Sequence, residues 1–118
     1  MKHLFFNIDC DLQLCAQKVF STLGVDDRIC EGDSSHVREG IYYFSTVFGV
    51  QIKLEYNSYD YDDVYKYMIA VKKHVLSQFT ADEEITDLVA EIVIKLLRNN
   101  LRATIAVEDS LGSLKILE

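Results

Sequence analysis

The stretch IYYFSTVFGVQIKLEYNSYDYDDVYKYMIAVK, residues 41–72, carries the clearest structural signal in the chain. Apolar and polar side chains alternate with a period of two over residues 50–57, which is typical of a β-strand with one face in water. The aromatic and β-branched run before it indicates a partner strand, and Gly49 can supply the positive φ of a tight hairpin turn. A second alternating run, residues 65–72, predicts a third strand.

Two amphipathic helices flank these strands. Asp9 or Asp11 can cap the first, whose apolar residues recur at helical spacing, and Gly24 is placed to end it. Residues 80–83 fit a capping box at the start of the second helix. We expect one face of the second helix to lie on the sheet. That face carries Ile85, Leu88, Val89, Ile92, Leu96 and Leu97.

The remaining segments give weaker signals. Residues 26–40 are polar and contain glycines, which favours a long loop. Residues 102–108, RATIAVE, indicate a fourth strand. Residues 3–8 fit either a short strand or the approach to the first helix, and the tail at residues 111–118 is ambiguous.

Together the segments predict a single α+β domain over residues 1–118, in the order helix, three strands, helix, strand. Strands joined by short hairpins form an antiparallel sheet. We therefore expect two layers, a four-stranded, mainly antiparallel sheet and two helices packed on one of its faces.

The chain is acidic. It has 12 basic and 19 acidic side chains among 118 residues, for a net charge of −7. Such a field repels phosphate backbones and anionic lipid surfaces and attracts basic partners. We therefore expect no direct binding of nucleic acid and no association with a membrane.

Cysteine usage and hydropathy indicate the compartment. The three cysteines form no CxxC pair, and an odd number suits a reducing compartment better than a disulfide framework. The apolar run near the start is too short for a secretory signal, and no run is long enough to span a bilayer. We expect a cytoplasmic protein.

No motif specifies a reaction, a metal or a cofactor, and we expect none of the three. The carboxylates at residues 60–63 lack the glycine and the closing glutamate of a calcium loop, and the histidines form no zinc-binding pair. His36 does lie in a polar loop with neighbouring carboxylates, where it could act as a general base. A small hydrolase or transferase using this loop is therefore an alternative.

The stretch at residues 55–67 holds five tyrosines and four acidic side chains. We expect Tyr56, Tyr65 and Tyr67 to pack in or beside the core. Tyrosines in the connecting segment would instead give large contact areas at low entropic cost, and carboxylates around them would steer a basic partner. The tyrosines and carboxylates of this connecting segment, together with a second acidic cluster at residues 26–33, are the predicted partner-binding residues. They are Asp26, Asp27, Glu31, Asp33, Glu55, Tyr59, Asp60, Tyr61, Asp62 and Asp63.

The stretch GIYYFSTVFGVQIKLEYNSYDYDDVYKYMI, residues 40–69, in a small acidic chain, resembles the immunity proteins of bacterial toxin systems, including contact-dependent growth inhibition and other polymorphic toxins. The resemblance implies a non-catalytic protein that binds the toxic domain of a cognate effector, often a basic nuclease, and covers its active site. A further alternative is a weakly homo-oligomeric regulatory domain that pairs sheet edges through residues 102–108 or the tail.

Overall fold

The computed structural model describes residues 2–35, 38–58, 64–74, 83–108 and 114–117. The elements in chain order are β1 (Lys2–Phe6), α1 (Leu12–Thr22), η1 (Asp26–Arg28), β2 (Cys30–Asp33), η2 (Arg38–Gly40), β3 (Ile41–Val47), β4 (Val50–Tyr56), β5 (Tyr67–Lys73), α2 (Glu83–Leu101), β6 (Ile105–Glu108) and β7 (Leu114–Leu117). The two short elements η1 and η2 are 3-10 turns.

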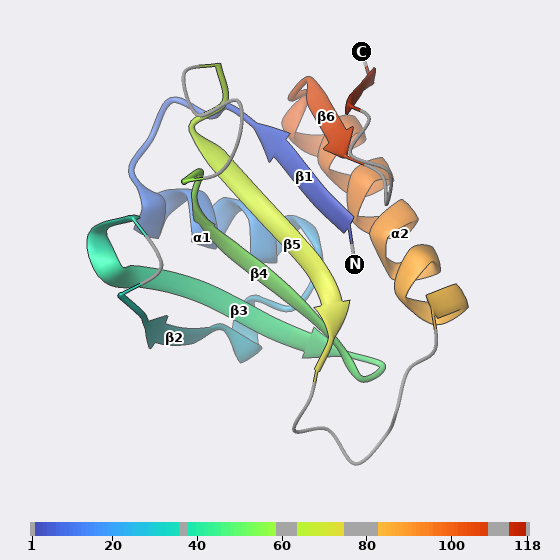
Figure 1. The fold of residues 1–118 in the computed structure, drawn as a ribbon, viewed down its shortest axis with the longest axis horizontal. Coiled ribbons are helices and arrows are strands. Elements are labelled where there is room, and N and C mark those ends of the chain that lie inside the picture. The colour runs from blue at the N-terminus through green and yellow to red at the C-terminus, as the bar shows by residue number, and fades with distance from the viewer. Residues whose placement is uncertain (1, 36–37, 59–63, 75–82, 109–113, 118) are drawn as a thin grey trace.

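The described strands form one sheet in the order β2-β3-β4-β5-β1-β6-β7, and each pair of neighbours is antiparallel. In Figure 1 the helix α1 lies behind the central strands, while α2 lies beside β1. The two helices contact each other, and α2 also contacts β1, β4 and β5. Side chains from both helices and from the strands beneath them form one large core cluster.

The predicted four-stranded sheet is wrong, because the described residues alone form a sheet of seven strands. The α+β class with two helices is correct. β2 lies within the segment predicted to be a loop, β1 is the strand between β5 and β6, and β7 forms from the ambiguous tail. The predicted order of elements fails for the same reason, since three strands are missing from it.

The first helix agrees with the prediction. The Asp11 carboxylate accepts a hydrogen bond of 2.8 Å from the Leu14 amide, so Asp11 is the N-cap. Gly24 follows the helix with a φ of 74°, which suits a residue without a Cβ. The apolar face of α1 is buried in the core, as its helical spacing indicates: Leu12, Cys15, Ala16, Val19 and Phe20.

The second helix presents a different face from the predicted one. Its buried residues are Thr86, Val89, Ala90, Val93 and Leu97. Leu88 and Ile92 belong to the predicted core face, yet they are 51% and 54% exposed. The apolar stripe of α2 is therefore wider than the arc that the sheet and α1 cover. Residues 80–82 of the predicted capping box lie outside the described residues.

The face of the sheet away from the helices is partly buried as well. A second cluster of buried residues, Phe5, Tyr65, Met68 and Ala106, packs there. Glu55 and Asn57, predicted to lie on a wet face, are both buried, so that prediction is wrong for these two residues. The Asn57 side-chain amide donates to the Tyr65 carbonyl at 3.0 Å, which satisfies this buried polar group. No helix in the described part of the chain is both long and apolar enough to cross a membrane.

Candidate functional site

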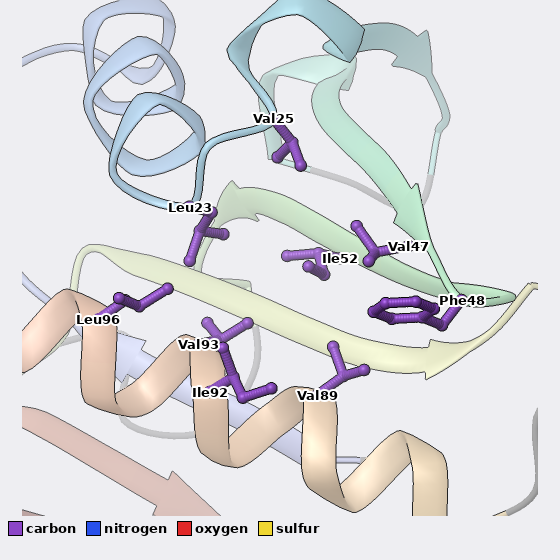
Figure 2. A pocket seen from close by; sticks show the side chains of 9 residues that line it. All are labelled: Leu23, Val25, Val47, Phe48, Ile52, Val89, Ile92, Val93 and Leu96. Carbon is purple, nitrogen blue, oxygen red and sulfur yellow. The ribbon is translucent and has the colours of Figure 1, made fainter.

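A groove with apolar walls opens between α2, the end of α1 and the β3–β4 hairpin (Figure 2). It encloses about 220 Å³. Each of its nine lining residues is apolar: Leu23, Val25, Val47, Phe48, Ile52, Val89, Ile92, Val93 and Leu96. Because none of the described residues that line it is polar, the groove offers shape and hydrophobic contact rather than acid–base chemistry within the described part of the chain.

The α2 wall of the groove exists because of the unusually wide apolar stripe on that helix. Val89 and Val93 lie at the floor and are buried, whereas Ile92 lies on the outer side and is half exposed. Leu88, one turn before Ile92, extends the apolar surface beyond the groove. Exposed apolar side chains that adjoin one another on a small domain mark a surface for binding.

The opposite wall ends at Phe48, whose conformation is unusual. Phe48 and Gly49 have φ values of 54° and 74°, so the two-residue turn between β3 and β4 has positive φ at both central positions, as a type I′ turn requires. Asparagine, aspartate or glycine normally occupies the first position, because a bulky side chain there is strained. Phe48 is nevertheless 70% exposed, and its ring lies at the mouth of the groove (Figure 2).

Exposed carboxylates lie beside the groove. Asp26 and Asp27, both exposed, directly follow the groove residue Val25. Asp27 pairs with Arg28 at 3.7 Å, and because both side chains are exposed to solvent the pair adds little stability. At the other side of the groove, Glu84 precedes Leu88 by one turn and is also exposed.

Two more of the predicted acidic residues belong to the edge strand β2. Glu31 lies opposite Tyr43 and Asp33 opposite Ile41 in the register of β2 and β3, and both carboxylates are exposed. Directly opposite residues point to one face of a sheet, and Tyr43 packs on the helix-side core. Burial, and then the charges of Glu31 and Asp11, raises the pKa of the Tyr43 hydroxyl. Glu31 and Asp33 are thus on the same side of the sheet as the groove, four and six residues along β3 from the groove residue Val47. Together with Asp26 and Asp27 of η1, we name them the acidic edge.

The other predicted partner-binding residues are either buried or outside the described residues. Glu55 is only 4% exposed, and its carboxylate lies 3.6 Å from the Lys53 ammonium on the face of the sheet away from the groove. It therefore does not contribute to an exposed binding surface. Tyr59, Asp60, Tyr61, Asp62 and Asp63 lie outside the described residues.

The alternative functions depend on His36, on metal-binding side chains or on the edges of the sheet. His36, on which the hydrolase alternative depends, lies outside the described residues. In the described part of the chain, no three His, Cys, Asp or Glu side chains are grouped so that they could hold a metal ion. The oligomer alternative uses residues 102–108 or the tail at a sheet edge. Within the described sheet, residues 105–108 form β6 between β1 and β7, so they are not at an edge, whereas β7 of the tail is an edge strand.

The groove was not predicted, although two signals for it are present in the sequence. The apolar residues of α2 span more than the single stripe that one sheet can cover. A phenylalanine also occupies a turn position that favours asparagine. Comparisons of the chain with protein-family models, with curated proteins and with solved structures give no match.

Proposed function

We propose that the protein is a non-catalytic binding protein that docks a basic protein partner in the apolar groove. The observation that carries the proposal is the exposed, strained Phe48 at the mouth of a groove whose described lining residues are all apolar. A bulky residue with positive φ lowers stability, and such strain tends to persist where it serves binding or catalysis. The described residues that line the groove carry no groups for acid–base catalysis, which favours binding.

The partner's chemistry follows from the surfaces around the groove. Apolar side chains of the partner would fill the groove, where Ile92 and Phe48 are still accessible to water. Lysine or arginine side chains flanking them would face the carboxylates of Asp26, Asp27 and Glu84. Complementary charge of this kind speeds association and selects the partner, while the buried apolar anchors supply most of the affinity.

The specific form of the proposal is an immunity protein. In this form, the partner is the toxic domain of a cognate effector, a basic and nuclease-like domain, and docking covers its active site. Support comes from the resemblance of residues 40–69 to such proteins, since this segment contains Val47, Phe48 and Ile52 of the groove. The net charge of −7 also favours a basic partner.

The experiment identifies the reading frames beside this protein's gene and co-expresses the protein with a toxic domain encoded there, read as growth of a sensitive host. Ile92 and Ile116 provide matched variants, because both isoleucines are 54% exposed but only Ile92 lines the groove. We expect the unaltered protein and the Ile116→Gln variant to protect the host. The Ile92→Gln variant should lose protection and bind the purified toxic domain more weakly in a calorimetric titration.

Two results would contradict the proposal. If Ile92→Gln and Ile116→Gln bind the toxic domain equally well, the groove is not the docking surface. If the unaltered protein neither binds nor protects, the immunity form is wrong, and the partner must be another basic protein.

A further inference from the structure

A depression on the other face of the sheet has the opposite charge to the acidic edge. It encloses about 350 Å³ on the face turned toward the viewer in Figure 1, where no labelled helix lies in front of the strands. Strands β3, β4 and β5 and the residue that follows β5 supply its lining: Tyr42, Phe44, Gln51, Lys53, Lys72, Lys73 and His74. Three lysines, a histidine and two aromatic rings thus share one hollow in an otherwise acidic protein.

The aromatic part of the depression is held in place by the backbone beside it. A Cβ added to Gly32 would lie only 2.3 Å from Cζ of Tyr42, so the ring covers the space that a side chain would occupy. The rings of Tyr42 and Phe44 are 5.8 Å apart between centroids, and the Lys53 ammonium lies 4.4 Å from the Tyr42 centroid. These contacts fix the rings and the Lys53 side chain before any ligand arrives.

The three lysines differ in how their charges are compensated. Lys53 pairs with the buried Glu55 at 3.6 Å, and Lys73 pairs with Glu83 at 3.9 Å. Lys72 is partly buried and forms no ion pair with any residue in the described part of the chain. Burial, and then the nearby charge of Lys53, lowers the pKa of Lys72, while Glu55 acts in the opposite direction. Burial and Lys53 therefore disfavour the positive charge of Lys72, and the nearby Glu55 carboxylate offsets this only in part.

We propose that this depression binds a small phosphate monoester with an aromatic or other apolar group. The ammonium groups of Lys72 and Lys53 would contact the phosphate, and Tyr42 and Phe44 would contact the apolar group. A phosphate monoester carries a charge of about −1.5 to −2 at pH 7, so it compensates two ammonium groups better than one carboxylate does. The proposal is independent of the groove, because its residues lie on the other face of the sheet.

The experiment titrates phenyl phosphate, inorganic phosphate, benzoate and phenol into the full chain, followed by amide chemical shifts of β3, β4 and β5 in NMR spectra. Phenyl phosphate should saturate with a dissociation constant of about 1 mM or tighter. Inorganic phosphate and benzoate should bind more weakly, and phenol should not saturate. Relative to phenyl phosphate, inorganic phosphate lacks the ring, benzoate lacks the second negative charge, and phenol lacks the charge altogether.

Three variants locate the site. Lys72→Gln should bind phenyl phosphate at least about tenfold more weakly, because a charge-assisted contact is lost. Lys72→Arg retains the charge and should retain binding. Lys95→Gln removes an exposed lysine of α2, outside the depression, and should bind like the unaltered protein. The thermal transition of each variant checks that it is folded.

The proposal is overturned if no probe gives saturable shifts, or if Lys72→Gln and Lys95→Gln bind phenyl phosphate equally. Shifts spread over all lysine-bearing surfaces would show general counter-ion binding only and would overturn it as well. Benzoate binding as tightly as phenyl phosphate would overturn the choice of a phosphate ligand.

Discussion

Replacing Phe48 with asparagine should separate the stability of the protein from its binding. In the β3–β4 turn, Phe48 has a φ of 54° and precedes Gly49. Asn-Gly is the sequence that a type I′ turn favours, because asparagine tolerates positive φ at little cost. The variant therefore keeps the turn and its register and removes only the aromatic ring from the mouth of the groove.

The expected change in stability is small, because two effects oppose each other. Phe48 is 70% exposed, so about 60 Å² of its surface is buried, and that burial stabilises the fold by about 1.5 kcal/mol. Asparagine at residue 48 relieves the strain of the left-handed conformation, which raises the free energy of unfolding by about 1–2 kcal/mol. The free energy of unfolding should therefore change by less than about 1 kcal/mol, and the melting temperature by less than about 8 °C.

The expected change in binding is large. The exposed 70% of Phe48 is about 140 Å², and burying it against a partner is worth up to about 3.5 kcal/mol. We expect Phe48→Asn to weaken the complex with the toxic domain by about 30-fold to 300-fold. Thermal unfolding measures the first quantity, and a calorimetric titration measures the second.

Two results would refute this reasoning. Ile52→Ala serves as the reference for a core residue of the same groove, since Ile52 is buried and its truncation should cost about 2–5 kcal/mol. If Phe48→Asn destabilises the protein as much as Ile52→Ala, then Phe48 is a core residue and not a docking anchor. If its affinity for the toxic domain is unchanged, the partner does not contact the mouth of the groove.

Three further predictions concern the fold. Asp11→Ala should lower the free energy of unfolding by about 1 kcal/mol in urea titrations, because α1 loses its N-cap bond, whereas Asp11→Asn should retain most of it. Gly32→Ala should destabilise the protein by about 1–3 kcal/mol, because the new Cβ meets the Tyr42 ring. When Tyr42→Ala is combined with Gly32→Ala, most of this penalty should disappear. Additive effects of the two substitutions would contradict the contact. Burial raises the pKa of the Tyr67 hydroxyl. The neutral hydroxyl therefore contributes its full stability below the usual tyrosine pKa of about 10, and this contribution is lost as the pH rises further. Between pH 8 and pH 11, the free energy of unfolding measured by denaturation should fall less for Tyr67→Phe than for the unaltered protein.

The parts of the fold that the sequence predicts well carry a clear local signal. α1 follows the helical period and β4 alternates with a period of two, so both could be predicted from periodicity. β3 could be predicted from its aromatic and β-branched residues, and β5 from an alternating run, although the first five residues of β5 are all buried. β1 lies between β5 and β6 and buries Leu4, Phe5 and Phe6, so its apolar residues do not alternate. Periodicity alone cannot distinguish such a run from a helical segment.

The missing edge strand and the misassigned helix face have a different cause. β2 is mostly exposed and contains Gly32, so neither hydropathy nor strand propensity marks it; its pairing with β3 decides its structure. For α2, the apolar residues outnumber those the sheet can cover, and only tertiary packing decides which of them are buried. The acidic edge could be predicted as a list of residues, but the place of Glu31 and Asp33 at the edge of the sheet follows from the pairing of β2 with β3.

Both candidate surfaces depend on one register. Within the β3–β4 hairpin, Val47 and Ile52 face the groove, while Phe44 and Lys53 line the depression on the other face. Because side chains alternate along a strand, a slip of one residue would exchange the two sets and expose the apolar one. The two-residue turn at Phe48 and Gly49 sets this register, so the strain at Phe48 is confined to a position that the fold already constrains. An anchor for a partner can be placed there at a small cost in stability, because the flanking pairs of the hairpin hold the turn in place.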